Sequence, residues 1–491
     1  MKYTLGIDVG SSSVKVSLLN LLDGSSAATA FYPSEEMPIK AIKSGWAEQE
    51  PQMWWENTKL ATLDVLKQAN VSKEQIKAIG ISYQMHGLVA LDKDGEVVRP
   101  SIIWADSRAV PIGRLAFEEL GEDYCLKNCL NSPGNFTASK LKWVKENEPE
   151  LYAKIYKIML PGDYIAYRLS GEMQTTVSGL SEGIMWDFAD RKVADKLLEY
   201  YDISQDLLAT IVDNFSEQSQ LSDAMATELG LVAGTPITYR SGDQPNNAFS
   251  LNVLEPGEVA ATAGTSGVIY GVSDKTSYDS KSRVNTFVHV NDTEQDNRLG
   301  VLLNINGTGI LNSWLRRNVA EGLSYPEMND LATSVPVGAE GLLVYPFGNG
   351  AERVLENSEP GARISGINFN IHNKAHVLRA AQEGIAFSFK YGADIMGEIG
   401  IDTKVVRAGN ANMFLSTLFR QTLSNLLDAK IELYDTDGSL GAARGAAVGA
   451  KLYDSYEDAF ANLKCIEIIT PDENQEQTIK AYENWKNNLQ F

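Results

Sequence analysis

The sequence has few of the residues from which disulfide frameworks and zinc sites are built. Its 491 residues include three cysteines and four histidines. Cys125 and Cys129 form a lone CxxxC pair and Cys465 lies far from them in the chain, so the paired spacing of a structural zinc site is missing. We therefore expect free thiols in a reducing cytoplasm.

Long hydrophobic runs are also missing. The longest stretch without a charged residue, residues 299–315, is shorter than the roughly 20 apolar residues that cross a bilayer, and it is rich in Gly and Asn. The N-terminal stretch reaches Asp8 after one short apolar run, which is typical neither of a signal peptide nor of an anchor. These features predict a cytoplasmic protein without a membrane partner.

Basic residues are in deficit. The chain has 43 Lys and Arg against 64 Asp and Glu, a formal net charge of −21. Such a surface repels phosphate backbones and anionic lipid head groups, so nucleic acid is not an expected partner. A small anionic ligand such as a nucleotide is still allowed, because backbone N–H groups or a metal ion can neutralise it locally.

The composition itself is that of a globular protein, with 44% hydrophobic and 9% aromatic residues. Single hydrophobic cores stop growing at roughly 250 to 300 residues. The length therefore predicts two domains. Pro and Gly punctuate the chain at residues 251–257, which favours domains of residues 1–252 and 253–491.

Two short segments share one pattern of strand, turn and strand. Residues 3–19 place β-forming runs on both sides of Gly10–Ser13, and residues 258–270 do the same around residues 264–267. The two turns are 254 residues apart, close to half the chain. Apolar residues recur at helical spacing elsewhere in both halves. We predict an α/β fold of two duplicated domains, with the two turns facing a cleft. The expected helices cover residues 51–68, 138–146, 376–399 and 413–427.

One carboxylate stands immediately before the predicted domain boundary. Asp243 follows Gly242 and is followed by Gln244 and Pro245. Because Pro245 disfavours a helical conformation at Gln244, we expect Asp243 to lie on a loop. An Asp in such a turn commonly bonds its own backbone, but this one adjoins the predicted cleft, where ligand sites tend to lie. Asp243 is therefore a candidate general base.

Other polar and aromatic residues have structural explanations as well. His86 interrupts a strand-like run, and a lone His in such a run is more often structural than a ligand. Asp106 and Arg108 are spaced for a local ion pair, and the tryptophans of residues 46–55 are expected in a core.

These segments, taken in chain order, resemble one family. They are Gly6–Gly10, residues 45–55, Gln84–Gly87, Trp104–Arg108, Gly242–Asp243 and Ala263–Gly267. Together they resemble the FGGY carbohydrate kinases over about residues 1–450. Within that family, Met85-His86-Gly87 and the Trp-Ala-Glu-Gln segment most resemble the members that phosphorylate D-xylulose.

The resemblance implies two actin-like (ribonuclease H-like) domains and an enzyme that uses MgATP to phosphorylate a ketopentose, with D-xylulose expected. It leaves a homodimer open. Asp243 matches the catalytic base, and Asp8 resembles the carboxylate that holds Mg²⁺. The expected sugar contacts are Met85, His86, Trp104, Asp243 and Gln244. The expected nucleotide contacts are Gly10, Ser11, Ser12, Ser13, Lys15, Gly264, Thr265, Ser266, Gly309, Gly409, Asn410 and Asn412.

The chain departs from the family pattern at three places. Gly350-Ala351-Glu352-Arg353-Val354 stands where the family usually has Gly-Glu-Arg-Thr-Pro. Residues 407–412 keep one of the family's three glycines, and Asp243-Gln244-Pro245 replaces the Asp-Asn-Ala that is common among xylulose-phosphorylating members. The alternatives are a kinase of the same fold for ribulose, rhamnulose, gluconate or glycerol, and an actin-like ATP-binding protein without sugar kinase activity. A catalytically inactive relative is disfavoured, because Asp8, Asp243 and both turns are present.

Overall fold

The computed structural model describes residues 1–490 and divides into two compact units. Unit 1 contains residues 1–252, 287–299 and 436–463, and unit 2 contains the rest of the chain. The expected division at residue 252 differs from this in two segments, because residues 287–299 and 436–463 pack with the first unit.

Unit 1 is built on a six-stranded sheet. Its strands are β1 (Tyr3–Val9), β2 (Val14–Asn20), β3 (Ser26–Tyr32), β5 (Ile76–Tyr83), β13 (Phe215–Gln220) and β14 (Pro236–Gly242). They lie in the order β13-β14-β5-β1-β2-β3. Strands β14, β5 and β1 are parallel to one another. At either side of these three, β13 runs antiparallel to β14 and β2 runs antiparallel to β1. The hairpin expected in residues 3–19 is confirmed as β1 and β2.

The seven-stranded second sheet repeats this pattern. Its strands are β15 (Val259–Ala263), β16 (Gly267–Ser273), β17 (Asn285–Val288), β18 (Leu299–Ile305), β21 (Val405–Gly409), β22 (Lys430–Tyr434) and β23 (Cys465–Ile469), in the order β17-β18-β16-β15-β21-β22-β23. From β16 to β23 the pairings are antiparallel, parallel, parallel and antiparallel, the same sequence as from β2 to β13. The predicted duplication is therefore confirmed at the level of sheet topology.

The helices of the two units are α1 (Pro51–Ala69), α2 (Val110–Leu120), α3 (Glu122–Asn128), α4 (Thr137–Asn147), α5 (Pro149–Tyr152), α6 (Pro161–Ser170), α7 (Val177–Glu182), α8 (Asp195–Tyr201), α9 (Asp223–Leu229), α10 (Asp243–Ser250), α11 (Gly309–Asn318), α12 (Tyr325–Thr333), α13 (Lys374–Glu398), α14 (Thr417–Leu427), α15 (Gly438–Gly449), α16 (Tyr456–Phe460) and α17 (Gln475–Asn487). The shorter strands are β4 (Glu48–Gln49), β6 (Val89–Leu91), β7 (Ser101–Ile102), β8 (Lys157–Met159), β9 (Gln174–Thr176), β10 (Trp186–Asp187), β11 (Lys192–Val193), β12 (Thr210–Val212), β19 (Leu343–Tyr345) and β20 (Arg363–Ser365).

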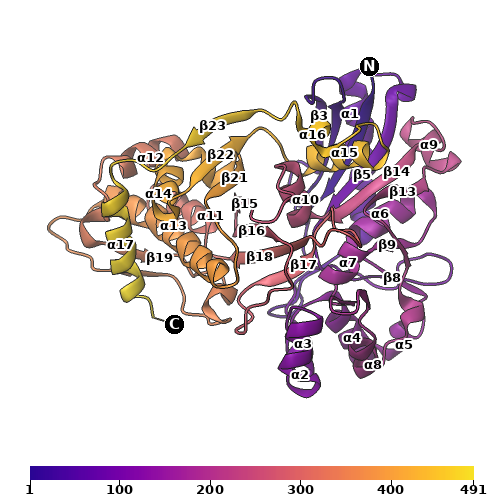
Figure 1. Cartoon of the computed structure of the whole chain (residues 1–491), viewed down its shortest axis with the longest axis horizontal. Helices are drawn as coiled ribbons and strands as arrows, with labels where there is room; N and C mark the ends of the chain where they lie inside the picture. Colours follow the sequence, from indigo (N-terminus) through magenta and orange to yellow (C-terminus); the bar gives the residue numbers. More distant parts are fainter. Residues whose placement is uncertain (491) are drawn as a thin grey trace. The chain divides into compact units, whose positions relative to one another are not determined.

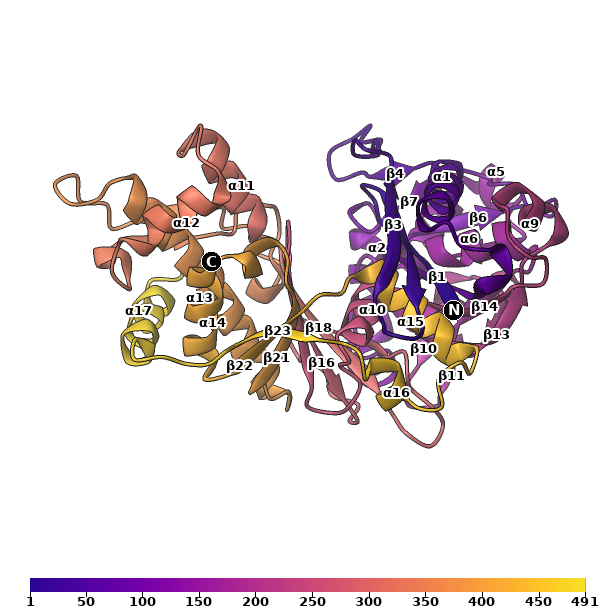
Figure 2. The ribbon, with the colours of Figure 1, turned by 90° about the horizontal axis from the view of Figure 1, so that it is seen from above.

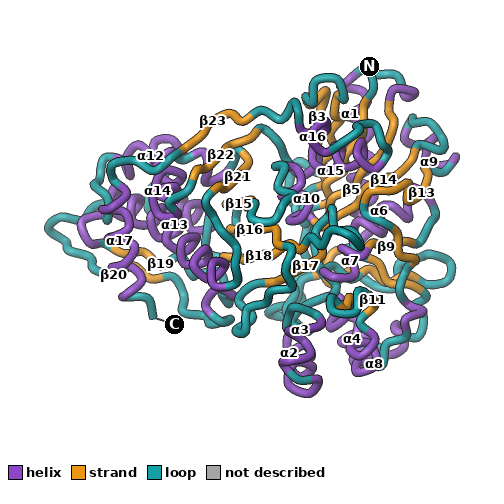
Figure 3. Tube along the Cα trace, in the orientation of Figure 1, coloured by secondary structure: helices purple, strands orange, loops and turns teal. Residues whose placement is uncertain are grey.

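The four helices expected from periodicity are confirmed as α1, α4, α13 and α14. Helix α1 shows why these ends are readable in a sequence. Pro51 stands in its first turn, where a missing N–H costs nothing, and Asn70 ends it in the left-handed conformation with φ 48°. In Figure 3, α13 and α14 lie beside the strands of the second sheet. Helix α17 packs against both of them.

Helix α15 explains why residues 436–463 belong to unit 1. Its sequence is mostly Gly and Ala, so its backbone can approach the sheet closely. It contacts β1, β5 and β14, and Figures 1 and 2 show this late, yellow helix among the early strands of the chain. Thr4 Oγ1 donates a 2.7 Å hydrogen bond to the Ala443 carbonyl, and Thr238 Oγ1 donates one of 2.7 Å to the Ala446 carbonyl.

The other expectations about the chain concern cysteines and membranes. Cys125 and Cys129 are buried free thiols, and Cys465 is an exposed one. Within residues 1–490, no helix combines the length and the apolar character that crossing a bilayer requires.

Candidate active site

Three parallel strands of unit 1 bring the predicted site residues to one sheet edge. Strands β1, β5 and β14 are parallel, with Val9 and Gly242 both paired to Tyr83. Asp8 lies at the carboxyl end of β1, Met85 and His86 follow β5, and Asp243 follows β14. Residues beyond the carboxyl ends of neighbouring parallel strands meet at one edge. The pairing of the sheet therefore assembles groups that are far apart in the sequence.

The first predicted phosphate turn joins β1 to β2. The Gly10 N–H donates to the Ser13 carbonyl at 3.0 Å, which closes the turn around Ser11 and Ser12. Ser12 is exposed. The turn thus presents backbone and hydroxyl groups at the end of the strand that carries Asp8, as a phosphate-binding turn requires.

Asp8 is a partly buried carboxylate beside the start of α15. Burial and the nearby charge of Asp437 raise its pKa to about 6, while the Ser82 hydroxyl and the Lys15 ammonium oppose this rise. Lys15 Nζ lies 2.5 Å from Asp437 Oδ2. The predicted nucleotide contact Lys15 is therefore held by an ion pair inside its own unit.

Asp437 is a site residue that the sequence analysis missed. It caps α15, with its Oδ1 accepting from the Leu440 N–H at 3.0 Å and from Ser439 Oγ at 2.7 Å. Burial alone would raise its pKa, but the Lys15 ammonium and these hydrogen bonds hold the pKa of Asp437 below its usual value. The pattern Asp-Gly-Ser ahead of an Ala-rich run is a readable helix start, although nothing local relates it to Asp8.

The surroundings of Asp8 fit a metal ion that arrives with a nucleotide. Within residues 1–490, no group of three or more His, Cys, Asp or Glu side chains is arranged to hold a metal. Mg²⁺ that accompanies a nucleotide keeps its waters and needs only one or two carboxylates. Gly438 lies directly against the Asp8 carboxylate, where a Cβ would overlap it. The single carboxylate of Asp8 therefore suits a metal ion that arrives with a nucleotide.

Asp243 opens a helix, so the predicted loop position is wrong. It is the first residue of α10, and Pro245 lies in the first turn of that helix. Proline is tolerated there because the first N–H groups of a helix have no intrahelical acceptor. Burial and the neighbouring charge of Asp8 raise the pKa of Asp243 to about 7, while the backbone and side chain of Gln244 oppose this. A carboxylate with this pKa can exchange a proton near neutral pH.

Two of the predicted sugar contacts, Met85 and Gln244, adjoin Asp243. A Cβ on Gly242 would overlap Met85 Cγ and Glu182 Oε2, so this backbone passes close to both side chains. Gln244 carries an inward Oε1 that makes no hydrogen bond within the described residues. His86 adopts the left-handed conformation with φ 62°, and its Nδ1 lies 2.8 Å from the Glu182 carbonyl oxygen.

Trp104 lies next to the first phosphate turn. Its side chain is 48% exposed, and its Nε1 is 3.5 Å from Ser11 Oγ. Two residues later the expected ion pair is confirmed, with Arg108 Nη2 2.6 Å from Asp106 Oδ2. Trp54 and Trp55 are buried as expected. Trp104 thus differs from the core tryptophans in keeping an open face near the sheet edge.

Glu182 is a second residue that the sequence analysis missed. It ends α7, is fully buried, and has no hydrogen-bond partner for Oε1 within the described residues. Burial and the nearby charges of Asp243 and Asp163 raise its pKa well above the usual value. Its Ser-Glu-Gly context carries no sequence signal of this environment.

The second predicted phosphate turn forms a separate group in unit 2. Gly264–Ser266 join β15 to β16, and the Gly309 N–H at the start of α11 donates to the Gly264 carbonyl at 2.9 Å. A Cβ on Gly264 would lie 3.6 Å from Asn412 Nδ2. This turn therefore meets the start of a ten-residue helix, a favourable place for phosphate.

The remaining predicted nucleotide contacts lie at the end of a strand beside β15. Gly409 ends β21, which is parallel to β15, and the Asn410 N–H donates to the Tyr434 carbonyl at 3.0 Å. The structure thus gathers the predicted residues into two groups. One lies at the sheet edge of unit 1 and the other at the corresponding edge of unit 2.

Family models match both halves of this arrangement. The N-terminal domain of the FGGY family of carbohydrate kinases matches residues 3–250, and the C-terminal domain of that family matches residues 259–450. The chain belongs to the FGGY family of carbohydrate kinases, and its two sheet-containing halves have the actin-like fold of that family. It is accordingly a carbohydrate kinase.

Individual relatives are similar along nearly the whole chain. A xylulose kinase of Bacillus subtilis (strain 168) is 30% identical over 463 residues, covering 93% of this chain and 90% of the relative. A xylulose kinase of Escherichia coli (strain K12) is also 30% identical, covering 94% and 92%. The crystal structure of xylulose kinase from Rhodospirillum rubrum superposes with a TM-score of 0.87 at 23% identity, covering 99% of this chain and 98% of that one.

Proposed function

We propose that this chain transfers the γ-phosphoryl group of MgATP to D-xylulose and forms D-xylulose 5-phosphate. The observation that carries the proposal is Asp243, a carboxylate with a pKa of about 7, beside Met85 and Asp8 at one sheet edge. The two relatives similar over nine-tenths of the chain, both named xylulose kinase, support the choice of sugar.

Asp243 acts as the general base in this proposal. It accepts the proton of the terminal C5 hydroxyl while that oxygen forms its bond to the γ-phosphorus and the bond to the ADP oxygen breaks. Its partly buried position favours this role, since a base works best with a pKa near the operating pH. The sugar is oriented by Gln244, whose Oε1 makes no hydrogen bond within the described residues, and by the segments at Met85, His86 and Trp104.

The two turns supply positioning and charge stabilisation. Phosphoryl transfer needs little covalent chemistry from the protein, so catalysis depends on alignment and on neutralising charge. Backbone N–H groups of residues 11–13 and 264–266 bind phosphate oxygens, Gly10 and Gly309 hold the two turns through their own N–H groups, and Lys15 adds a cation near the first turn. Asp8 would hold the Mg²⁺ that accompanies ATP, and the ion would neutralise charge on the phosphates.

A substrate panel tests the proposal. ADP release from MgATP would be measured in a coupled assay with D-xylulose, L-xylulose, D-ribulose, L-ribulose, L-rhamnulose, gluconate and glycerol. We expect turnover with D-xylulose well above the others. A different preferred sugar would keep the kinase chemistry and reject only the substrate. Turnover indifferent to every one of these compounds would reject sugar phosphorylation and favour an actin-like ATPase.

Two further parts of the proposal concern the protein's setting. Three free cysteines, two of them buried, suit a reducing cytoplasm. Light scattering on the purified chain decides between a monomer and the homodimer that the resemblance leaves open.

A further inference from the structure

A buried lysine on α4 joins the two segments that carry the predicted sugar contacts. Lys140 is 0% exposed. Its Nζ donates to the His86 carbonyl at 2.9 Å and to the Ile103 carbonyl at 3.0 Å. The first carbonyl belongs to a predicted sugar contact, and the second immediately precedes Trp104. One side chain therefore bridges the segment after β5 and the segment after β7.

The segment after β5 has a backbone conformation that needs support, and the segment after β7 is a turn. His86 has φ 62°, which a residue with a side chain adopts only when its surroundings hold it there. Its ring packs against Phe136 at 5.0 Å and Phe287 at 5.4 Å between ring centroids. Trp104 stands in a turn that closes where the Asp106 N–H donates to the Ile103 carbonyl at 3.1 Å. Lys140 contacts each segment at its carbonyl and so fixes their separation.

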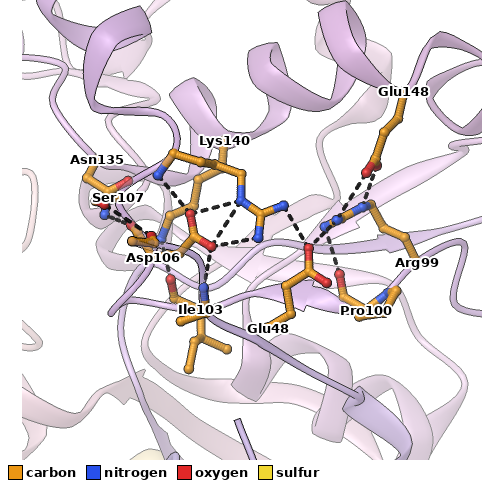
Figure 4. A network of polar contacts seen from close by, with 12 residues as sticks. Glu48, Arg99, Pro100, Ile103, Asp106, Ser107, Asn135, Lys140 and Glu148 are labelled. Atoms are coloured by element: carbon orange, nitrogen blue, oxygen red, sulfur yellow. Dashed lines mark hydrogen bonds and ion pairs between the residues drawn. The ribbon is translucent and has the colours of Figure 1, made fainter. Parts of the chain in front are cut away.

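An ionic network surrounds this lysine and ties it to the rest of unit 1. Arg108 bonds Asp106 and lies 2.7 Å from Glu48 Oε1 through Nη1, and Arg99 Nη2 lies 2.6 Å from the same oxygen. Figure 4 shows Lys140 beside Asp106 at one end of this network. Burial lowers the pKa of Lys140 to about 7, opposed by the charge of Asp106. Burying an ammonium group costs free energy unless it is hydrogen-bonded. The carbonyls of His86 and Ile103 supply those hydrogen bonds.

We infer that Lys140 is a positioning residue for sugar binding: its two hydrogen bonds hold the backbone at His86 and Ile103 so that Met85, His86 and Trp104 form one pocket wall. The inference rests on the proposed function, because it assigns these segments to the sugar. Lys140 contacts neither phosphate turn and does not contact Asp243. Its link to the first phosphate turn is indirect, through the 3.5 Å contact between Trp104 Nε1 and Ser11 Oγ, so we expect its main effect on the sugar.

The test removes the Lys140 ammonium group, which donates both hydrogen bonds, while keeping the length of the side chain. Lys140→Met leaves both carbonyls buried without this donor, which weakens any interaction that depends on their position. With D-xylulose as the sugar, we expect KM for the sugar to rise about tenfold or more. KM for ATP and kcat at saturating sugar should stay within about twofold of the wild type.

Lys142→Met is the matched control. Lys142 lies two residues further along α4, and its Nζ forms an ion pair with Glu146 at 3.1 Å, away from His86 and Ile103, so both kinetic parameters should be unchanged. Lys140→Arg retains a cation with several donors and should recover part of the sugar affinity. If circular dichroism shows that Lys140→Met is unfolded, Lys140→Arg and Lys140→Gln carry the test by the same split between sugar and ATP.

The outcomes distinguish failure of the positioning role of Lys140 from failure of the proposed function. An unchanged KM for D-xylulose in folded Lys140 variants, or equal rises in the KM for sugar and for ATP, overturns the positioning role and leaves the proposed function intact. A wild-type enzyme without sugar-dependent ADP release overturns the proposed function and this inference together.

Discussion

At the scale of single residues, the site depends on acidic groups whose proton affinity the fold has raised. Asp8 and Asp243 have pKa values of about 6 and about 7. Burial is the main cause for both, and each lies near another carboxylate. An ordinary Asp has a pKa near 4 and is a weak base. The fold thus converts a common side chain into one suited to proton transfer at neutral pH.

The first residue-scale prediction concerns pH. If Asp243 is the base, it must be ionised before the sugar hydroxyl reacts. We expect kcat/KM for D-xylulose to be level above pH 7 and to fall about tenfold per unit below it. Initial rates at subsaturating sugar between pH 5.5 and 9, at constant ionic strength, measure this. A profile that is level down to pH 5 would contradict the assignment.

Asp243→Asn is the matched variant, and it also tests the sign of the pKa shift. Turnover should fall by a factor of about 10² to 10⁴. The folded pKa of about 7 lies above the unfolded value, so the charged carboxylate reduces stability most above pH 7. That cost shrinks as pH falls toward about 4. Asn removes it. The melting temperature of the variant should therefore exceed that of the wild type more at pH 8 than at pH 5.

At the scale of elements, close packing of α15 on the strands of unit 1 positions Asp8 and Asp437. Gly6 of β1 and Gly80 of β5 lie so near the backbone of α15 that a Cβ at either position would overlap it. Neither glycine has a positive φ. A side chain is therefore excluded at these positions by the close approach of α15 and not by the backbone conformation. The Gly and Ala of α15 meet them from the other side.

The element-scale prediction follows from this contact. Gly80→Ala places a methyl group against the Ala442 carbonyl, and overpacking of this kind costs about 1 to 3 kcal/mol. Thermal unfolding followed by circular dichroism measures the loss. Gly397→Ala is the control, since nothing lies within 4 Å of a Cβ there and Ala is the better helix former. Equal stability of the two variants would contradict close packing of α15 on β5.

Local sequence signals predicted elements well and contacts poorly. The hairpins and the helices α1, α4, α13 and α14 are confirmed, because turn residues and helical periodicity act over a few residues. The loop expected at Asp243 is wrong, since Pro245 sits where a helix tolerates it. Lys140, Glu182 and Asp437 were missed because their importance comes from neighbours that are distant in the sequence. Lys140 bonds Ile103, 37 residues away, and Asp437 bonds Lys15, 422 residues away.

At the scale of the whole molecule, the chain crosses between the units more than once. Residues 436–463 belong to unit 1, although they follow most of unit 2 in the sequence. They include α15, which covers β1, β5 and β14. The N-terminal half of the sequence is therefore not a complete folding unit.

The whole-molecule prediction uses fragments. A fragment of residues 1–252 exposes the apolar face that α15 covers, so we expect it to aggregate or to lack cooperative unfolding. Joining residues 436–463 to that fragment through a flexible Gly/Ser linker should restore a soluble fragment with a cooperative transition. Circular dichroism and size-exclusion chromatography measure both. A fragment 1–252 that unfolds cooperatively alone would contradict this division.

The sequence by itself determined the two hairpins, the helices α1, α4, α13 and α14, the duplication and the family, and it named Asp8 and Asp243 as candidate site residues. These follow from short-range preferences and from motifs that keep their residues together. The tertiary structure decided which residues share a sheet edge, why α15 belongs to unit 1, and which carboxylates have a raised pKa. Those properties depend on burial and on charges brought together by parallel strand pairing, and no local stretch of sequence contains them.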